Sequence, residues 1–120
     1  IEIESNRDEY LAARARGKSW AEKTLAEGFA DVDVLIGCTF GPAWESSLAD
    51  GDNFQEASWI TQAPSIAGTP IGTIPMGLVS GLPVGLGFVS KEAEEAKLVA
   101  AMAKAERALN LGLLQPTFIK

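Results

Sequence analysis

The chain has 120 residues, 47% of them hydrophobic, and a formal net charge of −6. This length suits one domain with a modest core, and the acidic balance disfavours nucleic acid and anionic membranes as partners, because both attract basic patches. The sequence has no His and a single Cys, which excludes an internal disulfide, His-activated nucleophiles and His-ligated metal sites. The apolar stretches are too short to span a bilayer and the acidic start is unlike a signal peptide, so we expect a cytoplasmic protein without cofactor or metal.

The N-terminal third predicts two helices and a buried strand. Gly17 is a natural stop for the first helix, whose apolar residues are mainly Ala. Ser19 and Glu22 form a capping box, which predicts that a second helix starts directly afterwards. An apolar run then predicts a strand. The expected ranges are about 6–16 and 20–30 for the helices and 32–38 for the strand.

Residues 71–89 predict a β-hairpin, because two strand-length apolar runs are separated by a turn at 80–82. Successive side chains of a strand point to opposite faces, so Gly85 and Gly87 share one face of the second strand and larger apolar side chains share the other. One face can therefore pack a core, and the glycine face can let a neighbouring element approach closely. Pro75 cannot donate a ladder hydrogen bond and marks a bulge or a sheet edge.

The last predicted element is a helix at 91–109. Ser90 is its expected N-cap, acidic residues lie near its start and basic residues near its end, in agreement with the helix dipole. Four residues at helical spacing predict the stripe that faces the core: Leu98, Met102, Ala105 and Leu109.

Three motifs resemble the C-terminal part of the amidase signature hydrolases. In that family a G-x-P, a v-P-x-G and a G-l-P-v-G-l follow in this order, before a helix rich in Leu and Ala. The corresponding residues are Gly68-Thr69-Pro70, Ile74-Pro75-Met76-Gly77 and Gly81-Leu82-Pro83-Val84-Gly85-Leu86. The resemblance implies an α/β class, with residues 1–120 as a single piece that supplies part of a mixed sheet and its covering helices. Ile1 in place of an initiating Met agrees with a C-terminal fragment.

Amidase signature enzymes cleave carboxylic amides with a serine nucleophile, which a second serine on a cis peptide and a lysine activate. Those residues lie in the N-terminal half of the family fold, and no stretch of this chain resembles them. We therefore assign no catalytic residue and expect the chain alone to be inactive. The implied partners are the missing N-terminal catalytic portion and, in the parent enzyme, a small-molecule amide.

The resemblance also implies one wall of the substrate pocket. In the family, the loop after a strand such as 32–38 lies near the pocket, and Thr39 occupies that loop here. Ser65 stands where the family usually has Asn. With Trp59 and Ile66, these residues form the predicted substrate-binding wall.

Two alternatives stay open. The chain can belong to a glutamine-dependent amidotransferase A-type subunit, or it can be a binding or assembly module without catalysis. In each case a partial sheet exposes an edge and apolar surface, which predicts that the isolated piece forms a homo-oligomer.

Overall fold

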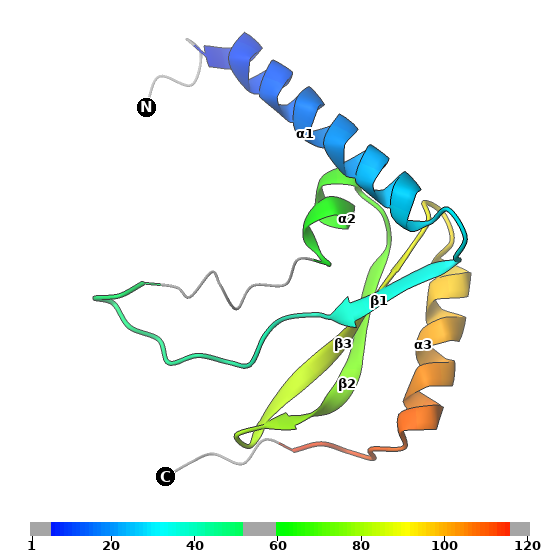
Figure 1. Ribbon diagram of the computed structural model, residues 1–120. Coiled ribbons are helices and arrows are strands. Elements are labelled where there is room, and N and C mark those ends of the chain that lie inside the picture. The colour runs from blue at the N-terminus through cyan, green and yellow to red at the C-terminus, as the bar shows by residue number, and fades with distance from the viewer. Residues whose placement is uncertain (1–5, 52–59, 116–120) are drawn as a thin grey trace.

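The computed structural model describes residues 6–51 and 60–115, and its α/β class confirms the prediction. The described strands form one sheet in the order β1-β3-β2, with helices before, between and after them along the chain (Figure 1). Both strand pairs are antiparallel, so a mixed sheet, as in the family expectation, is not visible within these residues. In chain order the elements are α1 (Arg7–Gly28), β1 (Val34–Cys38), α2 (Gln62–Ala67), β2 (Ile71–Val79), β3 (Leu82–Ser90) and α3 (Glu95–Leu109).

The hairpin of β2 and β3 is the centre of the fold. Ser80 and Gly81 join the strands with positive φ angles of 51° and 78°, the backbone that a two-residue hairpin turn requires. The register shifts between Pro75 and Gly77, so Pro75 lies at the bulge that it predicted. β2 is an edge strand of the described sheet, where a residue without a backbone N–H is tolerated.

The two faces of β3 pack against different helices. Towards α3, a cluster forms around the buried side chains of Ile74, Phe88 and Leu98. Towards α1 and α2, Val89 is fully buried in a second cluster. The alternation predicted for β3 therefore divides the core into two layers. The members of the second cluster are Ala21, Leu25, Phe29, Ala63 and Val89.

The prediction of two N-terminal helices is wrong, because α1 is one helix that runs through Gly17 and Ser19. A glycine inside a helix costs only about 1 kcal/mol relative to alanine, and the surrounding Ala, Arg, Lys and Glu are strong helix formers. Lys18 and Lys23 also pair with glutamates one turn later, at 3.7 and 3.9 Å. The serine side chain therefore caps nothing, and the helix ends at Gly28.

The C-terminal helix also starts later than the predicted residue 91. Ser90 is the last residue of β3, where it pairs with Val34 and its N–H donates to the carbonyl of Pro70 at 3.2 Å. Ser90 therefore pairs within the sheet and does not cap the helix as predicted, and α3 begins at Glu95. Of the predicted stripe only Leu109 is exposed, at 37%. β1 likewise begins at Val34, two residues after the expected start.

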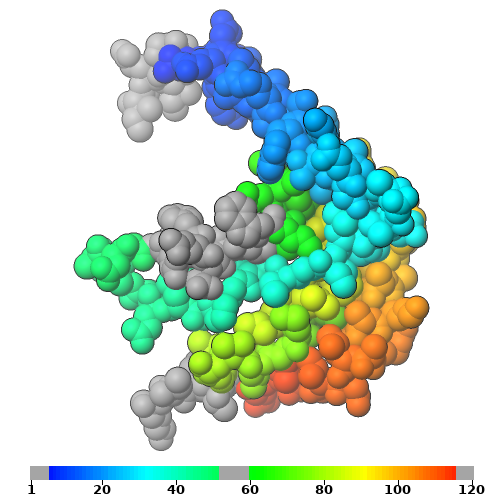
Figure 2. Space-filling view, in the orientation of Figure 1, coloured from blue at the N-terminus to red at the C-terminus, as the bar shows by residue number. Residues whose placement is uncertain are grey.

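The chain is extended for its size. Its radius of gyration is 17.7 Å, whereas a compact domain of 120 residues has about 14 Å. Its accessible surface is 9111 Å², against about 6,200 Å² expected for a compact monomer of this mass. Figure 2 shows the N-terminal half of α1 projecting beyond the rest of the molecule. The apolar side chains of Tyr10 and Leu11 on this half are exposed, as is that of Trp20 further along α1.

Candidate functional site

Thr39, the first predicted pocket residue, lies directly after β1 over the glycine face of β3. Its backbone N–H donates to the carbonyl of Gly85 at 2.8 Å, which extends the pairing of β1 with β3 by one step. Its side chain is half-buried and lies 2.6 Å, oxygen to oxygen, from the hydroxyl of Thr73 on β2. The Thr73 hydroxyl in turn donates to the carbonyl of Leu86 at 3.2 Å. Two outer strands thus place their hydroxyl groups together over the middle strand.

The glycines of β3 make room for this threonine pair. A Cβ atom at Gly85 would lie 2.6 Å from the Thr73 Oγ1 atom, closer than real Cβ contacts allow, and 3.0 Å from the Thr39 Oγ1 atom, which is tight. A Cβ at Gly87 would lie 3.1 Å from Thr39 Oγ1. The glycine face predicted from alternation therefore admits the threonine oxygens close to the backbone of β3, and at Gly87 also the backbone of Gly37 and Thr39.

Sequence reasoning missed Thr73. Pairing places it opposite Gly87, so its side chain lies on the glycine face by the same alternation that puts Gly72 and Ile74 on the α3 face. The sequence alone could not place Thr73 over β3, because that position depends on the register of β2 against β3.

The other predicted wall residues are placed differently. Ser65 and Ile66 are both exposed on the short helix α2, whose Ala63 packs in the cluster with α1. The side chain of Ile60, just before α2, lies against Gly37 of β1, where a Cβ atom would meet its Cδ1 at 3.1 Å. α2 is thereby held on the same side of the sheet as Thr39. Trp59 lies outside the described residues.

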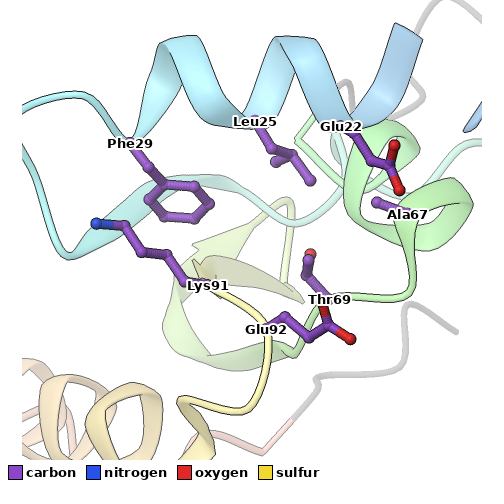
Figure 3. A pocket seen from close by; sticks show the side chains of 7 residues that line it. All are labelled: Glu22, Leu25, Phe29, Ala67, Thr69, Lys91 and Glu92. Carbon is purple, nitrogen blue, oxygen red and sulfur yellow. The ribbon is translucent and has the colours of Figure 1, made fainter. Parts of the chain in front are cut away.

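A shallow pocket of about 180 Å³ lies at the other end of β3. Leu25 and Phe29 extend from α1 toward Thr69 and Lys91 (Figure 3). The ammonium of Lys91 lies 5.8 Å from the centroid of the Phe29 ring, within range of a cation–π contact. Among the residues that the structure describes, the buried Thr69 hydroxyl oxygen has no hydrogen-bond partner. The remaining lining residues are Glu22, Ala67 and Glu92, and none of the predicted site residues is among them.

One charged cluster ties the start of β1 to α3. Lys97 donates to the carboxylate of Asp33 at 2.9 Å and to that of Glu94 at 3.0 Å. The hydrogen bond from Lys97 lowers the pKa of Asp33, and the hydrogen bonds to Asp33 and then to Glu94 raise the pKa of Lys97. Asp33 and Lys97 are solvent-exposed and Glu94 is half-buried, so the cluster orients α3 and contributes little to stability.

Within residues 6–51 and 60–115, no three His, Cys, Asp or Glu side chains gather where they could hold a metal ion. None of the described helices is long and apolar enough to cross a membrane. The chemistry available at the threonine pair is therefore hydrogen bonding by neutral hydroxyls.

Comparison with known proteins gives a consistent assignment, although no family model matches the chain. The A-type subunit of the Glutamyl-tRNA(Gln) amidotransferase of Halobacterium salinarum is 30% identical over 103 residues, covering 83% of this chain and 24% of the relative. The corresponding subunit from Exiguobacterium sibiricum is 33% identical over 97 residues, covering 78% and 20%. The chain thus spans about a fifth to a quarter of the length of these relatives.

Solved structures extend the likeness to three dimensions. The peptide amidase PAM, in complex with the competitive inhibitor chymostatin, is 32% identical with a TM-score of 0.74, over 91% of this chain and 22% of that protein. The native peptide amidase from Stenotrophomonas maltophilia is 28% identical with a TM-score of 0.72, over 92% and 22%. A bacterial aryl acylamidase of the amidase signature family shares the fold, with a TM-score of 0.58 at 21% identity. The chain is therefore homologous to a part of the amidase signature proteins, as its glycine and proline motifs predicted.

Proposed function

We propose that the chain forms the C-terminal part of an amidase signature hydrolase that cleaves carboxylic amides. The single observation that carries this proposal is the likeness to peptide amidase over more than nine-tenths of the chain at about 30% identity. The matched region makes up only 24% and 20% of these relatives, so the serine nucleophile, the second serine and the lysine would be supplied by residues that this chain does not contain. Alone, the chain is expected to hydrolyse no amide.

The contribution of this chain would be a scaffold and one wall of the substrate pocket. Thr39, Ser65 and Ile66 would face the substrate, together with Trp59. The close packing of Thr39 on β3 supports a positional role for it, because its hydroxyl is held by Thr73 and its backbone by Gly85. The exposure of Ser65 and Ile66 supports a role at a surface that another part of the protein covers.

A second function in the same family has its own support. Several relatives are A-type subunits of Glutamyl-tRNA(Gln) amidotransferase, so the parent can instead be the glutamine-dependent A-type subunit of an amidotransferase. A binding or assembly module without catalysis is the remaining alternative.

We place the protein in the cytoplasm, without nucleic acid or membrane partners, because a single Cys fits a reducing compartment and the chain is acidic.

We also propose that the isolated chain forms a homo-oligomer. Apolar side chains lie exposed on three elements: Trp20 on α1, Ile36 on β1 and Val99 on α3, at 50%, 63% and 61%. Light scattering coupled to size-exclusion chromatography tests this assembly, and a clean monomer at high concentration would exclude it.

Chimeras test the enzymatic proposal. The region of the Stenotrophomonas maltophilia peptide amidase that matches this chain is replaced by residues 1–120, and release of ammonia from a peptide amide is measured. A peptide amidase that lacks the region is the control. We expect activity in the chimera and none in the control or in the chain alone.

A second chimera separates the alternatives. The same replacement is made in the A-type subunit of the Halobacterium salinarum amidotransferase. Activity in this chimera alone would favour the amidotransferase role. Two folded but inactive chimeras, with circular dichroism and monodispersity like the parents, would overturn both enzymatic assignments and favour the module.

A further inference from the structure

The threonine pair on the glycine face has a defined hydrogen-bond polarity. A hydroxyl group carries one hydrogen and two acceptor lone pairs. The Leu86 carbonyl can only accept, so the hydrogen of Thr73 is used in that bond. In the 2.6 Å hydrogen bond between the two hydroxyls, Thr39 is then the donor and the Thr73 oxygen is the acceptor. The order of donation is Thr39 to Thr73 to the carbonyl of Leu86.

This order leaves the outer hydroxyl without a hydrogen to offer. In this arrangement Thr39 Oγ1 presents only lone pairs, so it can accept a hydrogen bond from a ligand, whereas donating one would break its bond to Thr73. We propose that the Thr39 hydroxyl is an acceptor subsite for the N–H of a carboxamide, with Thr73 as the positioning residue that fixes its polarity. The identity of the ligand class rests on the proposed function, whereas the polarity of the site rests on the described hydrogen bonds alone.

The site is pre-organised. The backbone N–H of Thr39 is tied to Gly85 at 2.8 Å, and Thr39 is β-branched, so its side chain has few rotamers. Gly85 and Gly87 allow both hydroxyls to lie against β3. Solvent reaches the pair, since Thr39 is half-buried and Thr73 is exposed. A ligand would therefore meet an acceptor that is already oriented, which reduces the entropic cost of binding.

The polarity also discriminates between an amide and the acid formed from it. A primary carboxamide has two N–H donors, whereas a carboxylate has none and would set its lone pairs against those of Thr39. Among the described residues, the atoms nearest to the added Cβ positions at Gly85 and Gly87 belong to neutral residues, namely the two threonines and Gly37. A neutral donor therefore fits better than a charged one. An amide substrate would be held here and its carboxylate product released.

The test uses the purified 120-residue chain and three small probes of similar shape. Propionamide can donate N–H hydrogen bonds, N,N-dimethylpropionamide cannot, and propionate is the acid. Backbone ¹H–¹⁵N NMR shifts are followed at Thr39, Thr73, Gly85 and Gly87. We expect saturable shifts at these residues with propionamide and not with the other two. Equal shifts with all three probes, or no shift with propionamide up to its solubility limit, would overturn the proposal. The comparison uses the unaltered chain, so it does not depend on whether a variant folds.

Variants then test the polarity itself. T39V should weaken propionamide binding roughly 3- to 10-fold, the effect of one hydrogen bond, and T39S should retain it. T73V frees the Thr39 hydrogen, so it should let propionate bind where the unaltered chain does not. Unchanged binding in T39V, or a T73V protein that still rejects propionate, would contradict the assigned order. Because binding is measured without turnover, an inactive chimera would refute the proposed enzyme and leave this result standing.

Discussion

Replacing Gly85 by Ala tests the packing on which both the sheet and the threonine pair depend. The new Cβ would lie 2.6 Å from Thr73 Oγ1, 3.0 Å from Thr39 Oγ1 and 3.3 Å from Thr39 Cβ. Neither threonine can move away easily, because both are short and β-branched and Thr39 is held to Gly85 through its backbone. The substitution therefore forces the two hydroxyls apart or displaces β1 from β3.

The magnitude follows from three contributions. Overpacking of this kind costs about 1–3 kcal/mol. Loss of the hydrogen bond between the threonines adds about 1 kcal/mol. Alanine in a strand recovers about 0.5–1 kcal/mol relative to glycine, since it loses less conformational freedom on folding. The free energy of unfolding should fall by about 1–3 kcal/mol, and each kcal/mol lowers Tm by about 4 °C for a domain of this size.

Urea unfolding followed by far-UV circular dichroism measures this loss, and Gly87→Ala is the matched control. At Gly87 the nearest atoms to a Cβ lie at 3.1 and 3.3 Å, so its cost should be smaller. In a double-mutant cycle, Thr73→Ala should cost less in the Gly85→Ala background than in the unaltered chain, because it removes the closest clash. A Gly85→Ala protein as stable as the unaltered chain, or an additive cycle, would refute the close approach.

Three further substitutions, one of them with a control substitution, test other parts of the fold. Gly17→Ala should stabilise the chain by about 0.5–1 kcal/mol and raise its helical circular dichroism, because among the described residues the added Cβ meets no other element within 4 Å and the helix is continuous; a loss of helicity would instead mean that a helix ends there. Leu25→Ala, which opens a cavity in the α1 layer, should cost about 2–5 kcal/mol in urea unfolding, whereas Val99→Ala on the exposed side of α3 should change stability by less than about 0.5 kcal/mol. Lys97→Met should raise the pKa of Asp33 toward its ordinary value of 3.8, measured by NMR titration of the carboxyl carbon. Because folding lowers this pKa, the pairing stabilises the fold above pH 3.8 and is lost as the pH falls through the lower folded value; an unchanged Asp33 titration would show that the ion pair does not form in solution.

The hairpin was readable from the sequence because its determinants are local. Alternation places Gly85 and Gly87 on one face whatever the neighbours are, and Pro75 excludes a regular ladder at its own position. The same reasoning found Leu98 as a core residue, since helical spacing alone marks it. These features depend on residues a few positions apart, and the structure retains them.

The errors arose where distant contacts outweigh local signals. Ser90 is a favourable helix cap, yet β1 pairs with it across more than fifty residues of sequence. Gly17 is a frequent helix end, but the cost of about 1 kcal/mol is too small to break a helix of strong formers. The site divides in the same way: the resemblance indicated Thr39, whereas Thr73 became visible only through the register that sets it opposite Gly87.

The position of the threonine pair also indicates what the remainder of the site must do. Among the described residues, α1 and α2 pack on the glycine face around Val89, and solvent reaches Thr73 at the other end. A hydrogen bond at an open surface gains little, because water competes for the same acceptor. Protein packed over this end would exclude that water and strengthen the bond to an amide N–H. The large exposed surface of the chain is consistent with such a covering layer, and the layer would have to lie on the same side of the sheet as α1 and opposite α3. The acceptor selectivity of Thr39 should therefore be detectable but weak in the isolated chain, and should increase in a chimera that restores the covering layer.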